Sequence, residues 1–219
     1  MKLGLLGKKI GMTQIFTEEG RFVPVTVIEA GPCVVLNVKK DKVLLGFGDK
    51  KEKRTPKQQL ALYKKYDVSP KTFLKEVFFD KIEDVSIGKS VTVDIFKEND
   101  YVDVSGTSKG KGFQGGVRRW GWAGGPGGHG SMHHRRIGSI GASSFPSKVN
   151  KGQHMPGRMG NVRKTVQNLK IVKVYNDKNI LLVKGCIPGA SNSFLEIRLA
   201  KKKKAVREEV KIDQKKDNK

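Results

Sequence analysis

Cysteine is nearly absent from this 219-residue chain, which has only Cys33 and Cys186. Two cysteines so far apart exclude a disulfide framework and provide no paired spacing of metal ligands. No stretch approaches the ~18 consecutive apolar residues that span a membrane. Aromatic residues make up only 7% of the chain and hydrophobic residues 37%, which suits a modest core. We therefore expect a soluble protein of a reducing compartment, with one or two domains.

The most informative absence is that of acidic residues from the middle of the chain. Between Asp103 and Asp177 no Asp or Glu occurs over 73 positions, although the chain has 21 acidic and 44 basic residues. The same run holds 13 of the Lys and Arg residues, 16 of the 26 glycines, both tryptophans and all four histidines. Because like charges repel one another, protein surfaces normally mix both signs. We therefore expect a polyanion to supply the counter-charge; the alternative is a disordered linker, although linkers are poor in aromatic residues.

Segments of strand composition flank this run on both sides. They are Leu3–Phe16, Phe22–Ile28, Val34–Val38, Val43–Phe47, Thr72–Phe79, Ser90–Phe96, Tyr101–Val104, Val166–Tyr175, Ile180–Val183 and Phe194–Leu199. Asn176–Asn179 has the residue types of a hairpin turn, and Lys50–Tyr66 is expected to contain one short helix. The expected fold is mostly β: one β-barrel domain interrupted by a long, irregular, glycine-rich basic extension, with one short helical insertion.

The expected domain organisation follows from these segments. Residues 1–103 and 166–200 form a discontinuous barrel domain with a partly helical insertion at 49–78, residues 104–165 form the extension, and 201–219 form a basic tail. About sixty residues without secondary structure do not suit a compact domain. The extension has too few aliphatic residues to offset an ordering cost of roughly 1 to 2 kcal/mol per residue. We therefore expect it to become ordered only on its partner.

The residues of the extension favour folded RNA as that partner. Arginine forks and lysines suit phosphate oxygens, aromatic rings stack on unpaired bases, and glycines let the backbone approach a ligand closely. For the two tryptophans, local packing is an open alternative, and both roles can hold at different positions. The expected RNA-binding residues are Lys109, Lys111, Phe113, Arg118, Arg119, Trp120, Trp122, His129, His133, His134, Arg135, Arg136, Lys148, Lys151, His154, Arg158, Arg163 and Lys164.

Two motifs could instead indicate a nucleotide-binding enzyme or a metal site. Gly110–Gly115 matches G-x-G-x-x-G, but a dinucleotide site also needs a following helix and an acid about 20 residues later. More glycine follows instead, and the next acid is Asp177. His129 and His133 have the spacing of a metal pair on a helix, but the glycines around them disfavour a helix. We expect no catalytic residue, metal or cofactor; a nucleotide-dependent enzyme using Gly110–Gly115 is the alternative.

At this point a family resemblance emerges. The chain resembles the bacterial-type family of the universal large-subunit ribosomal protein three over nearly its whole length to about Leu199. Only Lys50–Val77 and Lys201–Lys219 look individual. The matching motifs are Gly4–Phe16, Val104–Phe113, Arg119–Trp122, Gly124–Pro126, His129–Ser131, His134–Arg136, Gly138–Gly141, Met159–Asn161, Val166–Leu169 and Leu181–Gly185.

The resemblance implies a translation-protein-like barrel and an extension that threads through ribosomal RNA toward the peptidyl-transferase centre. Ala142, Ser143 and Ser144 would lie at its tip, nearest the catalytic RNA; some relatives carry a methylated glutamine at the Ser144 position, which serine cannot replace. It also implies a cytoplasmic, non-catalytic protein of the large subunit that binds early in assembly. Its partners would be large-subunit rRNA and neighbouring ribosomal proteins, with no membrane, small-molecule substrate or second copy of itself.

Overall fold

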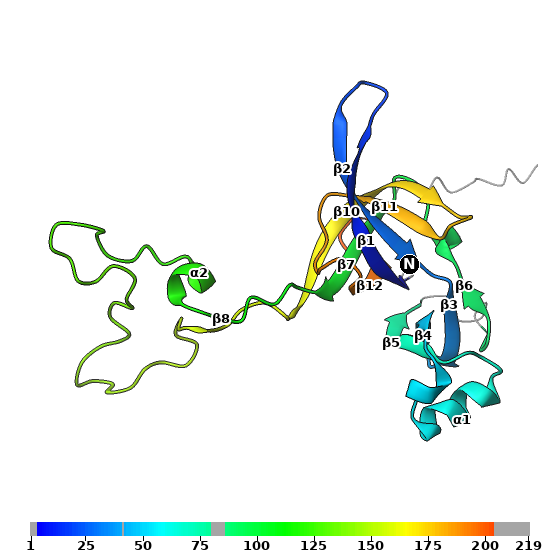
Figure 1. Ribbon diagram of the computed structural model, residues 1–219, viewed down its shortest axis with the longest axis horizontal. Coiled ribbons are helices and arrows are strands. Elements are labelled where there is room, and N and C mark those ends of the chain that lie inside the picture. The colour runs from blue at the N-terminus through cyan, green and yellow to red at the C-terminus, as the bar shows by residue number, and fades with distance from the viewer. Residues whose placement is uncertain (1–3, 41, 80–85, 204–219) are drawn as a thin grey trace, which may run out of the picture. The chain divides into compact units, whose positions relative to one another are not determined.

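The computed structural model describes residues 4–40, 42–79 and 86–203 (Figure 1). The chain divides into two compact units, Met1–Gly106 with Lys164–Lys219, and Thr107–Arg163. Of the expected basic tail at 201–219, residues 204–219 lie outside the described part of the chain. Within the described part, no helix has the length and apolar character needed to cross a membrane.

Six strands of the first unit close into a barrel, which confirms the mostly β fold (Figure 1). Their order around the barrel is β1–β12–β7–β10–β11–β2. The hairpin turn expected at Asn176–Asn179 is present between β10 and β11. The barrel strands are β1 (Gly4–Phe16), β2 (Phe22–Ala30), β7 (Tyr101–Thr107), β10 (Arg163–Tyr175), β11 (Ile180–Lys184) and β12 (Phe194–Leu199).

The strands between β2 and β7 form a sheet of their own. These are β3 (Cys33–Val38), β4 (Lys42–Asp49), β5 (Lys71–Phe78) and β6 (Ser90–Val91), in the order β5–β4–β3–β6. We expected Val34–Val38 and Val43–Phe47 among the barrel strands, but they pair in this separate sheet, because alternation of side chains identifies a strand and does not identify its neighbours. Gly31, at φ +89°, redirects the chain between the barrel and this sheet.

Short helical elements interrupt this second sheet. The expected helix within Lys50–Tyr66 is present as α1 (Lys57–Lys65), preceded by the 3₁₀ turn η1 (Glu52–Arg54). Ser90–Phe96 was expected to be one strand, but only its first two residues are. The 3₁₀ turn η2 (Val93–Ile95) follows them and directs Val93 into the core.

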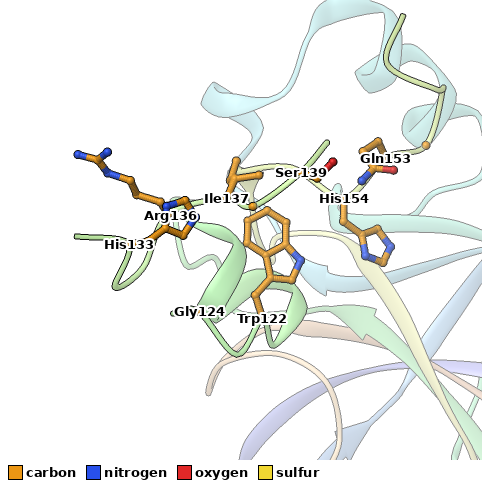
Figure 2. A pocket seen from close by; sticks show the side chains of 10 residues that line it. Trp122, Gly124, His133, Arg136, Ile137, Ser139, Gln153 and His154 are labelled. Atoms are coloured by element: carbon orange, nitrogen blue, oxygen red, sulfur yellow. The ribbon is translucent and has the colours of Figure 1, made fainter. Parts of the chain in front are cut away.

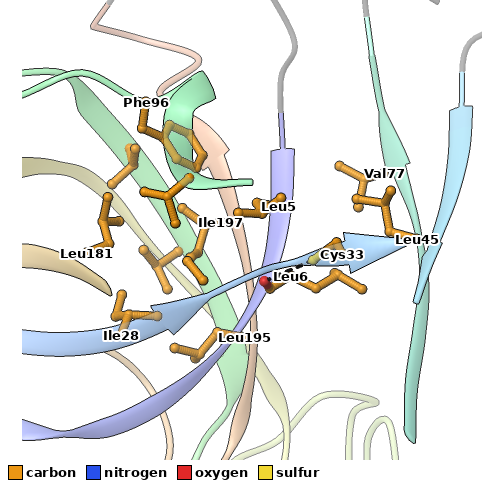
Figure 3. Close-up of a cluster of buried hydrophobic side chains, with 14 of the residues drawn as sticks. Leu5, Leu6, Ile28, Cys33, Leu45, Val77, Phe96, Leu181, Leu195 and Ile197 are labelled. Carbon is orange, nitrogen blue, oxygen red and sulfur yellow. Dashed lines mark hydrogen bonds between the residues drawn. The ribbon is translucent and has the colours of Figure 1, made fainter. Parts of the chain in front are cut away.

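One hydrophobic core joins the barrel and the second sheet (Figure 3). Leu5 and Leu6 of β1 belong to the same buried cluster as Leu45 of β4 and Val77 of β5. At its centre the Cys33 thiol donates to the Leu6 carbonyl over 3.3 Å, and burial raises the pKa of this thiol to about 12. The thiol therefore stays protonated and serves as a small packing group.

Lys9 is a basic residue whose role lies within the fold of the barrel. It is only 7% exposed, and its Nζ donates to the carbonyls of Ile187 and Gly189 at 3.3 and 3.5 Å. These bonds satisfy a buried ammonium group and attach the β11–β12 connection to β1.

Candidate nucleic-acid interface

The two ends of the Thr107–Arg163 unit run antiparallel to each other. Ser108 N–H donates to the Val162 carbonyl at 3.0 Å, and Lys111 N–H donates to the Met159 carbonyl at 2.9 Å. The ladder continues into two short strands, β8 (Phe113–Gln114) and β9 (Gly157–Arg158). The unit was expected to lack secondary structure. These backbone bonds need no particular side chains, so the residue types alone did not reveal them.

This unit has almost no interior. Among residues 107–163, all of which are described, only Gly116 is buried, and none belongs to the hydrophobic core cluster. Large apolar side chains are instead exposed: Phe113 is 76% exposed and Phe145 is 88% exposed. The shape of this segment is therefore held by backbone hydrogen bonds and a few local contacts, not by burial.

A five-residue helix, α2 (Gly116–Trp120), anchors the local contacts. Gly116 is required because a Cβ there would lie 1.8 Å from the indole ring of Trp122. At the other end of α2, Arg119 Nη1 and Trp120 Nε1 both donate to the Met155 carbonyl, at 2.7 and 2.9 Å. The Trp120 ring also stacks on the His154 ring, with centroids 3.9 Å apart.

The two tryptophans thus have different surroundings. Trp122 is partly buried against Gly116, which is a packing role inside this unit. Trp120 is 41% exposed, and the Arg119 guanidinium lies 4.8 Å from its ring centroid. The His154 ring and the Arg119 guanidinium thus both lie over the Trp120 ring, and the three side chains form one stacked cation–aromatic cluster at the surface of this unit.

A cavity of about 440 Å³ opens beside this cluster (Figure 2). It is lined by Trp122, Gly124, His133, Arg136–Ser139 and Gly152–His154. Trp122 and His154 offer aromatic surface, while Arg136, Gln153 and Ser139 offer hydrogen-bonding groups. This combination suits a splayed-out nucleobase, which is held by stacking and by bonds to its edges. Gln153, Ser139 and Ile137 were missed by the sequence analysis, because neutral residues carry no electrostatic signal.

The residues expected to bind RNA lie almost entirely in this unit. Lys164 is the exception, since it is the first residue of the other unit after the break. All of them are exposed except Arg119 and Trp122, which are partly buried. The expected tip residues Ala142, Ser143 and Ser144 are exposed as well. Arg119 is already bonded to the Met155 carbonyl, so part of its hydrogen-bonding capacity is used within the protein.

The glycine motif Gly110–Gly115 is not built as a dinucleotide site. No helix was expected after the motif, and this was wrong, because α2 begins at Gly116. However, α2 ends after five residues at Gly121, whose φ is +74°, and β8 lies inside the motif instead of before it. The strand–turn–helix order that a pyrophosphate requires is therefore missing.

The histidines do not assemble a metal centre in the described structure. His129 has a φ of +56° and lies outside any helix, so the i,i+4 spacing to His133 has no helical meaning here. Among the described residues, no group of three or more His, Cys, Asp or Glu side chains is placed to hold a metal ion. The His134 Nδ1 atom lies 2.9 Å from the Pro126 carbonyl, which fits a local structural bond.

Together the fold and this surface define a class of protein: a β-barrel that carries a basic, glycine-rich unit with almost no core of its own. The family described as Ribosomal protein L3 matches residues 75–179. Large ribosomal subunit protein uL3 of Syntrophotalea carbinolica is 48% identical over 209 residues, which cover 92% of this chain and 100% of that protein. The uL3 protein of Syntrophomonas wolfei is 49% identical, covering 93% of this chain and 98% of its own length. The uL3 protein of Brachyspira hyodysenteriae is 44% identical, covering 92% of this chain and 96% of its own length. The chain belongs to the ribosomal protein L3 (uL3) family.

Proposed function

We propose that this protein is a structural, non-catalytic constituent of the large ribosomal subunit that binds large-subunit (23S-type) rRNA through residues 107–164. The observation that carries the proposal is that one segment combines a uniformly positive charge with the lack of a hydrophobic core. Thr107–Arg163 contains ten Lys and Arg residues and no Asp or Glu, and only Gly116 in it is buried. Such a segment neither neutralises its own charge nor buries its own apolar side chains. A partner therefore supplies the counter-charge and buries the apolar side chains.

The charge sets the expected strength of the salt effect. Each neutralised phosphate contributes about −0.7 to −0.9 to the slope of log affinity against log salt. If every one of the ten cations of Thr107–Arg163 contacts one phosphate, the slope approaches about −7 to −9. Arg119 is partly occupied by Met155, so the measured slope should fall somewhat short of this limit.

The cavity supports RNA with unpaired bases as the specific ligand. Regular duplex RNA hides its base edges in a narrow groove, whereas loops and bulges present them to side chains. A cavity lined by aromatic rings and by Arg136 and Gln153 can hold one such base. This part of the proposal explains why tryptophan and histidine accompany the cations in the extension.

The family supports the remaining parts of the proposal. We expect the protein to reside in the cytoplasm within the large subunit, with ribosomal proteins as neighbours, to join early in assembly, and to act as a single copy. Ala142, Ser143 and Ser144 would lie toward the peptidyl-transferase centre. The domain boundaries at 103/104 and 165/166 belong to the same proposal, with 104–165 as the RNA-threading extension.

The deciding experiment measures binding of the full chain to large-subunit rRNA at increasing salt, together with limited proteolysis. We expect a steep loss of affinity with salt. We also expect cleavage between Gly106 and Arg163 in the free protein, and protection of these sites in the complex. An affinity nearly independent of salt, or equal cleavage with and without RNA, would contradict the proposal.

A further inference from the structure

The β1–β2 hairpin continues beyond the barrel as a two-stranded ribbon (Figure 1). β1 and β2 pair all the way to Phe16 and Phe22, which lie directly opposite each other. β12 pairs with β1 only over Gly4–Lys8, and β11 pairs with β2 only over Val25–Glu29. Among the described strands, none therefore flanks residues 10–16 and 22–24.

One face of this ribbon carries mostly apolar side chains, and the largest of them are exposed. Side chains alternate along a strand, so Phe22 and Pro24 lie on the same face of β2 as the core residues Ile28 and Ala30. The register places Phe16 opposite Phe22, Gln14 opposite Pro24, and Met12 opposite Thr26 on that face, so one exposed polar side chain, that of Gln14, lies among the apolar ones. Phe16 is 71% exposed, Phe22 64% and Met12 52%. We call Met12, Phe16, Phe22 and Pro24 the ribbon face.

Contiguous exposed apolar side chains on a soluble protein often mark a site of interaction with another molecule. A two-stranded ribbon is also marginally stable when it stands alone in water. The core-facing row of β2 thus continues past the point where the barrel can cover it, and a second molecule that packs there both buries the row and stabilises the ribbon.

The charge of the ribbon differs from that of the rest of the chain. Between Lys9 and Lys39 there is no lysine, and the only basic residue is Arg21, in a protein whose net charge is +23. Arg21 pairs with Glu19 at 3.5 Å, and Glu18 is an exposed second carboxylate at the same turn. A surface that contacts phosphates carries an excess of cations, and this one does not.

We infer that the ribbon face, with Glu18 beside it, is a docking surface for another protein of basic character, and that this partner is a neighbouring protein of the large subunit. The inference rests on the proposed function. Proteins that share one rRNA carry Lys and Arg for the same reason that this chain does, so an apolar face next to carboxylates complements them in charge. Apolar burial supplies the contact, and the acidic turn disfavours RNA at the same place.

Photo-cross-linking in assembled particles tests this docking surface. The photoreactive p-benzoylphenylalanine replaces Phe22 in the full chain, and large subunits are reconstituted from rRNA and the complete set of large-subunit proteins. The expected adduct is to one basic ribosomal protein, identified by mass spectrometry. The same group in place of Phe113, which is 76% exposed in the other unit, is the matched control and should give an adduct to rRNA.

The outcomes separate the two proposals. If the Phe22 probe is incorporated at one copy per particle but joins rRNA, a second copy of this chain, an acidic protein or nothing, the docking surface is overturned. If the protein does not enter particles at all, or the Phe113 probe gives no RNA adduct, the proposed function itself fails.

A pair of variants gives an independent measurement. The double substitution Phe16→Gln and Phe22→Gln should lower retention of the cross-linked partner in reconstituted particles at least fivefold, while the affinity of the chain for rRNA alone stays within twofold. Thr13→Gln is the control, because Thr13 is exposed on the opposite face of the ribbon and should leave partner retention unchanged. Equal retention in the double variant and the control would overturn the inference.

Discussion

The indole ring of Trp120 lies flat against the imidazole ring of His154, with their centroids 3.9 Å apart and 4° between their planes. The same indole donates to the carbonyl of Met155, the next residue after His154. These contacts join the two ends of the stretch from 121 to 153, so a long irregular segment becomes a closed loop. The wall of the 440 Å³ cavity draws on residues near both ends of that loop and from its interior.

The stack itself can be tested with His154→Ala. Stacked aromatic pairs contribute about 0.5–1.5 kcal/mol beyond area burial, so local opening of α2 should increase roughly two- to tenfold. The measurement is amide exchange of Arg119 and Gly121, whose N–H groups donate to the carbonyls of Gly115 and Val117. His133→Ala, at another exposed histidine, should leave this exchange unchanged. Unchanged exchange in His154→Ala would show that the stack does not hold α2.

Gly116→Ala tests whether close packing of Trp122 shapes the interface. A Cβ at this position would lie 1.8 Å from the indole, so Trp122 must move. We expect the affinity for rRNA to fall about tenfold, whereas the melting temperature of the barrel stays the same. Gly115→Ala is the matched control, because a Cβ there meets no atom within 4 Å and its φ is −69°. Equal affinities of the two variants would contradict the packing role.

Arg118→Ala tests a single phosphate contact. Arg118 is exposed, unlike its neighbour Arg119, which is partly buried and bonded to the Met155 carbonyl. Loss of one phosphate contact should weaken rRNA binding and make the salt slope shallower by about 0.7 to 0.9. The slope is obtained from filter-binding titrations at several salt concentrations. Arg21→Ala, on the ribbon, should not change it; an unchanged slope for Arg118→Ala would remove this residue from the interface.

Gly138→Leu tests the cavity as a base site. Gly138 lies in the cavity wall, and a Cβ there meets no heavy atom within 4 Å, so the leucine occupies space without a clash. Stacking of one base is worth about 1–3 kcal/mol, so binding should weaken at least about fivefold. The salt slope should not change, because no charge is removed. Gly128→Leu has equally free surroundings away from the cavity and should bind like the native protein.

The second sheet offers a prediction on pH. Asp49 accepts hydrogen bonds from Lys71 Nζ at 2.6 Å and Ser69 Oγ at 2.9 Å, and these hold the pKa of Asp49 below its ordinary value of 3.8. A carboxylate with a lowered pKa stabilises the fold above its unfolded pKa and loses this contribution as the pH falls through the folded pKa.

Asp49→Asn should therefore lower the free energy of unfolding at pH 7. The side chain of Asp49 is 77% exposed, so solvent screening limits the loss to less than about 1 kcal/mol. Urea unfolding at a series of pH values should show the difference between variant and native protein shrinking below pH 3.8. A difference that is the same at pH 7 and pH 3 would mean that the ion pair does not cause it.

The sequence was most informative where a strand is bounded by strong turn residues. Phe194–Leu199 was predicted with the bounds that the structure gives, because alternating apolar residues stand between a polar turn and a lysine run. The assignment of strands to sheets was less accessible. Val34–Val38 and Val43–Phe47 look like barrel strands by composition, but which neighbour a strand pairs with depends on contacts far along the chain.

For the candidate interface, the residue types indicated RNA as the ligand but did not indicate how the side chains are arranged in space. The charge pattern alone selected the cations, and their contacts with RNA stay a prediction. The cavity could not be anticipated, because it requires His154 to reach Trp120 and the backbone near 138 to approach 152. Neither contact has a periodic pattern or a charge signature in the sequence.

The nearly coreless Thr107–Arg163 unit also affects how variants of this protein should be screened. Thermal melting of the purified chain reports on the buried side chains of the barrel, and Gly116 is the sole buried position between residues 107 and 163. Substitutions throughout that segment should thus pass such a screen as neutral, even where they weaken the proposed binding to rRNA. Mutational tolerance here has to be scored in growing cells or in assembled particles.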